Sequence, residues 1–551
     1  MRGMPWKSEL RLLSHKLTGY YPIREMINLF AGGRLLALPL GKKRRMLVLL
    51  TGSLLLAAII LSLFRFGLPG AAPVQARGES SISLEEMSEN LEEQVPELME
   101  YYDIPGAAVA LIREGEVAWW QSFGYADREA QIPVTDETLF RAESITKSVT
   151  AWAVMNLVEA GRVDLEDPVE RHLGGWQFPN SNFPSQEVTV RRLLSHSAGL
   201  SGGLTREPPG EERPPRQEVL EGKHGLPRAE LVRSPGSGFE YSNQGFVALE
   251  LMVEEVTGRD YQAYLQEEIL GPLGVETFYF DIDEEASSNL ATGYDYEGEP
   301  VPMYQDPFRG AGGLLISAED LARFWAAGAA ASDGQEPGKG VLQPESVKRL
   351  YTSEVKPDGF YALGSDGFGL GYFIDILPGA EKAVFHAGEG AGSLGQAYLV
   401  PQEGEGIVIL TNSKRSWPLI YQLTGKWADW SGYSRPAMSQ AYSTVQGVIW
   451  VLVALLLLGA AVKVVLLWWW LRAGHNCFAP FSPEKRFTRF LQVGLALMAL
   501  LLWWLVGEMV VANLLPVIYG RLGLALGALA VSTLLTASFP PGDDRAKLTR
   551  V

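Results

Sequence analysis

A serine and a lysine three residues apart are the first residues of this chain whose types and spacing indicate chemistry. Ser144 and Lys147 lie in the stretch 143–148 (ESITKS), and apolar residues recur after them at helical spacing. Residues three apart share a helix face, so the Lys147 ammonium would lie one turn behind the Ser144 hydroxyl. A serine hydroxyl attacks a carbonyl when a base takes its proton, and a lysine becomes that base when burial or another cation lowers its pKa. The N–H groups of the first helical turn would point at the carbonyl oxygen.

The spacing alone is a weak signal, because a serine N-cap followed by a lysine in the first turn is common. A second stretch, 235–243 (PGSGFEYSN), is an irregular loop before a predicted helix, Gln244–Val256. In an extended segment Tyr241 and Asn243 point the same way. A lysine could draw the tyrosine toward phenolate for proton transfer, and the asparagine could orient the lysine and a substrate. The alternative is an ordinary aromatic loop anchor.

A third stretch, 385–389 (FHAGE), closes a predicted strand, Ala383–His386. Backbone N–H groups at such a strand edge can serve as oxyanion donors, and Ala387 and Gly388 are small enough for close approach. His386 could bind substrate or assist proton transfer, although a lone histidine is more often structural. The following G-x-G-x-x-G at 390–395 opens a strand rather than a helix, which argues against a dinucleotide site. His196, in a turn at 195–200, is expected to hydrogen-bond backbone.

Strands at both ends of one region, with helices between them, would bring these stretches together. An amphipathic helix with a capping-box start at Ser83 comes first. The sequence predicts one sheet built from both chain ends, a helical subdomain inserted between them, and the site at the seam. The predicted elements are strands 107–112 and 116–124 joined by a turn at 114–115, helix 188–194, strands 371–376, 383–386, 396–400 and 406–410, and helix 417–430.

Four apolar stretches are long enough to cross a membrane. Met46–Phe64 follows four basic residues, and Thr444–Leu471, Thr488–Ala512 and Leu522–Phe539 come near the end. The first is either an uncleaved anchor or a signal peptide cleaved after residues 74–76 (VQA). Basic residues around 472–489 and in the tail predict that the loop and the tail lie in the cytoplasm. We therefore expect a multi-pass protein of the cell membrane with an extracytoplasmic domain and a cytoplasmic C-terminus. The charged residues Lys463 and Glu508 are expected to snorkel to an interface.

Composition excludes several classes of protein. The formal charge is −17 and the pI about 5.0, which argues against a nucleic-acid binder. The single cysteine, Cys477, excludes an intrachain disulfide and makes a thiolate metal centre unexpected. We expect no metal and no cofactor, and as partners a small-molecule or peptide substrate and membrane lipid.

The predicted division of the chain has nine parts. These are a cytoplasmic or over-extended N-terminal segment 1–45, a transmembrane helix or signal-peptide core 46–64, a linker 65–82, an exported domain 83–435, transmembrane helices 444–471, 488–512 and 522–539, a cytoplasmic loop 472–487, and a cytoplasmic tail 540–551.

In this order the motifs at 144–147 (SITK), 241–243 (YSN) and 386–388 (HAG) resemble those of the serine β-lactamase and penicillin-binding-protein superfamily. The most similar branch holds class C β-lactamases, D-aminopeptidases and esterases. The resemblance covers about residues 85 to 430 and implies an α+β fold, with an antiparallel sheet flanked by helices and a helical subdomain. It leaves the apolar segments unaccounted for.

The resemblance implies an acyl-enzyme mechanism. Ser144 would attack an amide or ester carbonyl, with Lys147 and Tyr241 sharing the proton transfers and Asn243 positioning them. The N–H groups of Ser144 and Glu389 would form the oxyanion hole, and water would release the acyl group.

One departure affects the expected substrate. β-Lactamases carry Lys-Thr-Gly where this chain has His386, Ala387 and Gly388. A neutral histidine and a methyl group lose the attraction for a substrate carboxylate, so a peptidase or esterase is favoured over a true β-lactamase. Membrane-tethered family members that trim an N-acyl-D-amino-acid cap from exported prodrugs are similar in layout. The alternative from another class is a non-hydrolytic penicillin-binding or cell-wall sensor protein; transport by three C-terminal helices is weakly supported.

Overall fold

A computed structural model of the chain describes residues 82–202, 213–332, 334–379, 381–474, 478, 486–506 and 516–539. Several sequence predictions fall outside these residues. They concern the apolar segment 46–64, the cleavage motif 74–76, Cys477, Glu508 and the tail 540–551.

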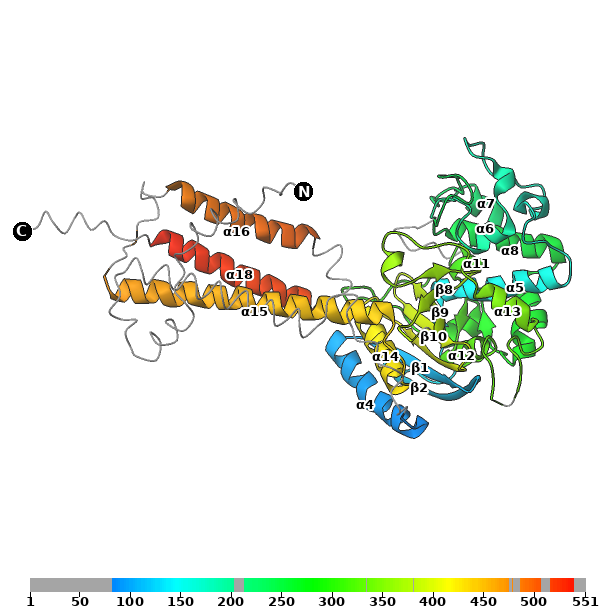
Figure 1. Cartoon of the computed structure of the whole chain (residues 1–551), viewed down its shortest axis with the longest axis horizontal. Helices are drawn as coiled ribbons and strands as arrows, with labels where there is room; N and C mark the ends of the chain where they lie inside the picture. The colour runs from blue at the N-terminus through cyan, green and yellow to red at the C-terminus, as the bar shows by residue number, and fades with distance from the viewer. Residues whose placement is uncertain are drawn as a thin grey trace, which may run out of the picture. The chain divides into compact units, whose positions relative to one another are not determined.

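The centre of the fold is an eight-stranded antiparallel sheet in the order β3-β2-β1-β11-β10-β9-β8-β7 (Figure 1). β1 (Gly106–Arg113) pairs with β11 (Glu405–Thr411), so the two ends of the domain meet inside the sheet, as predicted. The other strands are β2 (Glu116–Asp127), β3 (Ile132–Pro133), β7 (Gly367–Phe368), β8 (Phe373–Ile376), β9 (Lys382–Glu389) and β10 (Leu394–Val400).

The predicted turn between β1 and β2 consists of Glu114 and Gly115, both with positive φ, at +54° and +76°. A two-residue turn of this kind matches the right-handed twist of a hairpin. The hairpin is therefore set by local sequence.

Each face of the sheet is covered by helices. Val109 and Leu111 of β1 pack in the cluster that includes α4 (Leu84–Tyr102) and α14 (Trp417–Trp430), whereas the alternate residues Ala108 and Ala110 face the second cluster. This alternation is the period-two pattern of a strand buried on both faces. Ser83 caps α4 by accepting from the Glu86 N–H at 3.1 Å, as the capping pattern predicted.

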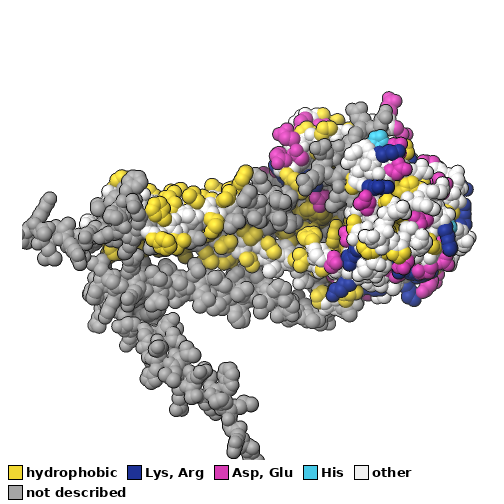
Figure 2. Space-filling model, turned by 90° about the horizontal axis from the view of Figure 1, so that it is seen from above, with side chains coloured by type: hydrophobic (Ala, Val, Ile, Leu, Met, Phe, Trp, Pro, Cys, Tyr) yellow, Lys and Arg dark blue, Asp and Glu magenta, His cyan; other side chains and the backbone are white. Residues whose placement is uncertain are grey.

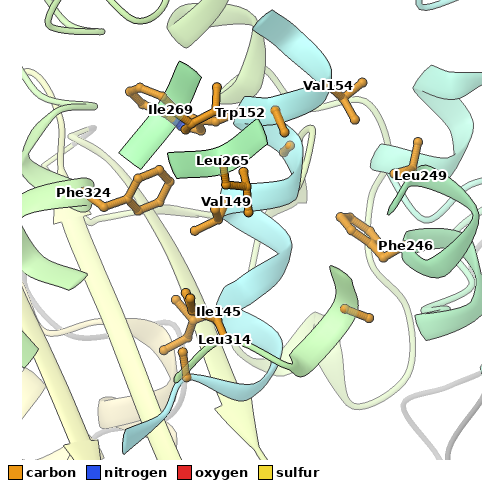
Figure 3. Packing of buried hydrophobic residues seen from close by; sticks show 14 of the residues in the cluster. Ile145, Val149, Trp152, Val154, Phe246, Leu249, Leu265, Ile269, Leu314 and Phe324 are labelled. Atoms are coloured by element: carbon orange, nitrogen blue, oxygen red, sulfur yellow. The ribbon is translucent and has the colours of Figure 1, made fainter. Parts of the chain in front are cut away.

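The second cluster is organised around α5 (Thr146–Glu159), in which all residues from Thr146 to Met155 are buried. Figure 3 shows Ile145 beside Leu314 at the helix start, with Phe246 and Leu249 of α8 (Asn243–Thr257) on the opposite side. A helix packed on all sides is held firmly, so residues at its start have fixed positions.

The remaining elements are short. They are β4 (Phe140–Arg141), η3 (Glu143–Ile145), η4 (Val169–His172), η5 (Ser185–Glu187), α6 (Val190–Leu194), α7 (Arg216–Leu220), α9 (Tyr261–Leu265), η6 (Gln266–Leu270), η7 (Gly271–Leu273), β5 (Phe278–Tyr279), α10 (Glu284–Asn289), α11 (Arg309–Gly312), β6 (Leu315–Ile316), α12 (Ala318–Ala326), α13 (Pro344–Leu350) and η8 (Tyr361–Leu363).

Several element boundaries differ from the prediction by one to three residues: β2 continues to Asp127, β8 begins at Phe373 and β10 begins at Leu394. The helix predicted from residue 188 begins at Val190, because Thr189 adopts an extended backbone and caps it by accepting from the Arg192 N–H. The strand predicted to end at His386 continues to Glu389, since β9 pairs with β10 up to Glu389 opposite Leu394.

Three helices follow the domain: α15 (Ala437–Arg472), α16 (Arg486–Val506) and α18 (Pro516–Ser538). Within the described residues, 437–472 and 520–538 are long and apolar enough to cross a membrane. Figure 2 shows hydrophobic side chains gathered along these helices. The start of α15 contacts the domain, since the Ala437 N–H donates to Asp375 at 3.2 Å.

The expectation that Lys463 snorkels to an interface stays a prediction. Its ammonium on α15 donates to the Thr533 hydroxyl of α18 at 2.6 Å. This hydrogen bond joins α15 to the neighbouring helix α18.

Candidate active site

Ser144 lies in the single turn η3, which leads directly into α5. The Lys147 ammonium donates to Ser144 Oγ at 3.0 Å and to the carbonyl oxygen of Ala311 at 2.7 Å. Lys147 is fully buried. The S-x-x-K spacing thus produces direct contact between the hydroxyl and the amine.

Burial lowers the pKa of Lys147 from its usual 10.5 to about 7, although the negative charges of Asp306 and Glu143 act to raise it. Near neutral pH the amine therefore exists in both protonation states. A group with this pKa can take a proton from a serine hydroxyl and return it later in the reaction.

Tyr241 lies just before α8, and its hydroxyl is hydrogen-bonded to Ser144. The Lys147 ammonium is 4.9 Å from the centre of the Tyr241 ring. Burial raises the pKa of Tyr241, and the neighbouring Tyr361 adds to the increase. The expectation that Lys147 draws this phenol toward phenolate is therefore wrong for the resting site, where Tyr241 is a neutral hydroxyl.

His196 packs against the ring of Tyr241. Its Nδ1 accepts from the Ser242 N–H at 3.2 Å, and its ring lies 4.2 Å from that of Tyr241. The structure confirms the prediction of a histidine that hydrogen-bonds backbone.

Asn243 is the first residue of α8 and lines the same cavity as Ser144 and Tyr241. Its side-chain oxygen has no hydrogen-bond partner. The preceding Ser242 caps the helix by accepting from the Gly245 N–H at 3.2 Å, which fixes the backbone on both sides of the cap.

His386 is fully buried on β9. Its Nδ1 lies 2.9 Å from the carbonyl oxygen of Ala387, an arrangement that assigns the proton to Nδ1. Burial and the nearby charge of Lys147 lower the pKa of His386 to about 3, so the ring is neutral. Nε2 then carries a lone pair, and it has no partner among the described residues.

Gly388 brings β9 against the nucleophile turn. A Cβ at this position would lie 2.2 Å from the Ala142 carbonyl oxygen and 2.9 Å from the Glu143 Cβ, so only glycine fits. β8 pairs with β9 from Lys382 to Phe385. Beyond Phe385 that edge of β9 is not paired to β8, and an extended substrate can lie against it.

Glu389 ends β9 at the rim of the cavity. Its carboxylate accepts from the Lys414 ammonium at 2.8 Å. The side chain is thus engaged in an ion pair, and the backbone N–H is the part of Glu389 that the proposed oxyanion hole uses.

Two acids beside the nucleophile were not predicted. Glu143 immediately precedes Ser144, is 5% exposed and has a positive φ of +51°. Burial, with a further contribution from Asp306, raises the pKa of Glu143 from 4.5 to about 7. The residues that contact Glu143 lie far from it in the sequence. Only its position next to Ser144 could have indicated from the sequence that it belongs to the site.

A cavity of about 1050 Å³ contains these groups. Its lining includes Ser144, Tyr241, Asn243, His386 and Glu389, so the structure brings all these predicted residues together. Gly388 and Lys147 lie directly behind them, in contact with Ala142 and Ser144. Among the described residues no three His, Cys, Asp or Glu side chains are grouped to hold a metal ion.

The chain is similar to known proteins over this region. A family model described as Beta-lactamase matches residues 91–423. Protein flp of Staphylococcus aureus is 26% identical over 362 residues, which are 64% of this chain and 70% of that protein. Unguisins hydrolase ungD' of Aspergillus campestris is 26% identical over 377 residues, 62% of this chain and 66% of that protein.

Solved structures share the fold. The octameric penicillin-binding protein homologue from Pyrococcus abyssi is 31% identical, with a TM-score of 0.52 over 63% of this chain and 78% of that chain. A class C β-lactamase matches with a TM-score of 0.50 over 63% of this chain and 98% of its own, at 19% identity, which supports the fold alone.

Proposed function

The chain belongs to the β-lactamase family and is a serine hydrolase of that family, and from this premise we propose that it cleaves an amide or ester through an acyl-enzyme on Ser144. The observation that carries the proposal is the 3.0 Å contact between the Lys147 ammonium and Ser144 Oγ. A buried amine with a pKa of about 7 supplies the base that a serine needs.

The proton path follows from the contacts of Ser144. Neutral Lys147 takes the proton as Ser144 Oγ attacks the carbonyl carbon. Tyr241, which is hydrogen-bonded to the same hydroxyl, passes its proton to the leaving group and regains one from the Lys147 ammonium, which restores both groups, and Asn243 orients the substrate. The same groups then activate a water molecule that releases the acyl group.

The negative charge that develops on the tetrahedral intermediate must be stabilised by hydrogen-bond donors. We assign this role to the backbone N–H groups of Ser144 and Glu389, because the close packing of Gly388 on Ala142 holds the two backbones together. Fixed donors stabilise a developing oxyanion without reorganisation during the reaction.

The substrate class follows from the end of β9. Neutral His386 and the Ala387 methyl group offer no cation for a carboxylate, which disfavours β-lactams and favours a peptide amide or small ester. A relative carries the name of a hydrolase of unguisins, and this is consistent with hydrolysis of a non-β-lactam substrate.

We further propose that the domain is membrane-anchored and extracytoplasmic. α15 and the 520–538 segment have the length and hydropathy of spanning helices, and α15 begins seven residues after α14 ends. Protease treatment of intact cells would digest an extracytoplasmic domain, whereas protection of the domain in cells and its release by alkaline washing would contradict the assignment.

Labelling with a fluorescent fluorophosphonate tests the reaction. The full chain in detergent should be labelled, and Ser144→Ala should abolish both labelling and hydrolysis of a 4-nitrophenyl ester. Ser148→Ala is the matched control, because this buried serine on the same helix donates to the Gly371 carbonyl and lies outside the cavity. Undiminished hydrolysis by Ser144→Ala would refute the proposal.

A fluorescent penicillin separates the enzyme from a non-hydrolytic penicillin-binding protein. A covalent adduct on Ser144 that persists for hours, with no ester or amide hydrolysis, would support a binding or sensor protein. Turnover of an ester together with weak penicillin labelling supports the hydrolase.

A further inference from the structure

Glu143 adopts a backbone conformation that a glutamate rarely takes. Its φ of +51° lies in the left-handed region, which is strained for a residue other than glycine. Gly388 and Gly390 leave space for it, since a Cβ at Gly390 would overlap the Glu143 carboxyl. The chain thus tolerates strain and burial to keep a carboxyl group beside the nucleophile.

The carboxyl is hydrogen-bonded but has no cation. Glu143 Oε1 accepts from the Ser393 hydroxyl at 2.8 Å and the Tyr304 hydroxyl at 3.3 Å. No salt bridge joins it to any described residue. The nearby cations donate their hydrogen bonds to other groups: Arg141 to the Tyr304 carbonyl, Lys414 to Glu389, and Lys147 to Ser144 and the Ala311 carbonyl.

Asp306 adds a second negative charge to the same cavity. Its Oδ1 accepts from the Phe308 N–H at 2.7 Å, and within the described residues it too forms no salt bridge. The two acids repel each other, which contributes to the raised pKa of Glu143. Lys147, whose pKa both acids raise, offsets this repulsion only in its protonated form, and a bound cation would relieve the repulsion when the amine is neutral.

His386 provides independent evidence about the occupant. It is fully buried, its Nδ1–H is used by Ala387, and its Nε2 lone pair lacks a donor in the cavity that it lines. An unpaired buried acceptor costs free energy, which an occupant that donates a hydrogen bond would recover.

We propose that this cavity selects an amine-bearing substrate: Glu143 and Asp306 bind a protonated amino group, and His386 Nε2 accepts a hydrogen bond from a substrate N–H. An amino-acid amide or peptide with a free amino group fits this description. The inference rests on the proposed function, since it assigns the substrate class of the Ser144 site.

A pair of substrates that differ in one charge tests the inference. The full chain in detergent is assayed with alanine 4-nitroanilide, in D and L forms, and with the N-acetylated compounds. We expect kcat/KM to be at least about tenfold higher for the free amine, because acetylation removes the positive charge that the two carboxylates attract. Equal values, or a preference for the acetylated form, would overturn the inference.

Two variants assign the preference to the acids. Glu143→Gln and Asp306→Asn keep the shape of each side chain, and each should reduce the free-amine preference about tenfold, mainly through KM. Glu405→Gln is the matched control, because burial also raises the pKa of Glu405 to about 7, but this residue lies outside the cavity. An undiminished preference in both cavity variants would refute the assignment to these acids.

Protection from labelling provides a readout that does not depend on turnover. Alaninamide should slow fluorophosphonate labelling of Ser144 at concentrations where N-acetylalaninamide does not. Equal protection by both amides, with Ser144 still labelled, would refute the amine subsite and leave the proposed hydrolase intact. Absence of Ser144 labelling would instead refute the proposed function.

Discussion

The two sides of the cavity differ in how their polar groups are satisfied. On the helix side, Ser144, Lys147 and Tyr241 hydrogen-bond one another or the backbone. On the β9 side, which includes Glu143 because its side chain packs from the nucleophile turn against Gly388 of β9, His386 Nε2 lacks a donor and Glu143 forms no salt bridge with a described residue. Ser144, Lys147 and Tyr241 thus form a closed hydrogen-bonded set, whereas the side-chain oxygen of Asn243, His386 Nε2 and the Glu143 carboxyl lie outside it.

This difference separates reaction from recognition. A self-contained hydrogen-bonded set can transfer protons for many substrates, so the helix side carries the chemistry that the family shares. Unpartnered groups define what the occupant must supply, so the β9 side carries specificity. Substitutions on the two sides should therefore affect different kinetic parameters.

The largest effect should come from Lys147→Met. Loss of the base should lower kcat/KM by about a thousandfold, within the range known for general acid–base groups. Steady-state kinetics on the free-amine anilide and a neutral ester should show the same loss for both, because the proton transfer is common to them.

Lys382→Met, at the other end of β9, is the control for Lys147→Met, since its ammonium donates to the Tyr351 carbonyl outside the cavity. If Lys147→Met lowered kcat/KM for only one of the two substrates, the assignment of reaction to the helix side and recognition to the β9 side would be contradicted.

Tyr241→Phe should have the next largest effect. Removing the hydroxyl while keeping the ring against His196 should lower kcat by roughly a hundredfold and leave KM nearly unchanged. Pre-steady-state kinetics with a good and a poor leaving group should show the larger loss for the poor one, since it needs the proton. An effect on KM alone would place Tyr241 in recognition instead.

The residues of the helix side were predictable because their relation is local. Ser144 and Lys147 are three residues apart on one helix, and Tyr241 and Asn243 flank one cap. The sheet was predictable as well, because β1 and β11 carry continuous apolar runs. The protonation state of Tyr241 was not, because it depends on burial by distant residues rather than on the lysine nearby.

The β9 side depends on contacts far apart in the sequence. Glu143 meets Tyr304 and Ser393, which follow it by 161 and 250 residues. It has a positive φ and lies close against Gly388 and Gly390, and no pattern in the sequence signals either feature. The motif at 386–388 indicated a strand near the nucleophile, but not which of its atoms would be left without partners.

Gly388→Ala tests the contact between the two sides. The added methyl group would overlap the Ala142 carbonyl oxygen, so we expect about 1–3 kcal/mol of destabilisation and roughly a tenfold loss of kcat/KM as β9 moves away. Thermal unfolding and kinetics check both effects.

Gly245→Ala is the matched control for Gly388→Ala, because its Cβ would meet Leu193 at an ordinary 3.4 Å. Full activity and stability in Gly388→Ala would show that β9 is not held against the nucleophile turn.

Glu143→Gln should have the smallest effect on the neutral ester, visible as a shift of its pH profile. Activity requires neutral Lys147, so the acid limb of kcat/KM should follow the Lys147 pKa of about 7. The Glu143 carboxylate raises that pKa, and its removal should move the acid limb to lower pH, by less than about one unit because Glu143 is only partly ionised there. An acid limb that moves to higher pH or stays in place would contradict its assignment to neutral Lys147 beside the Glu143 carboxylate.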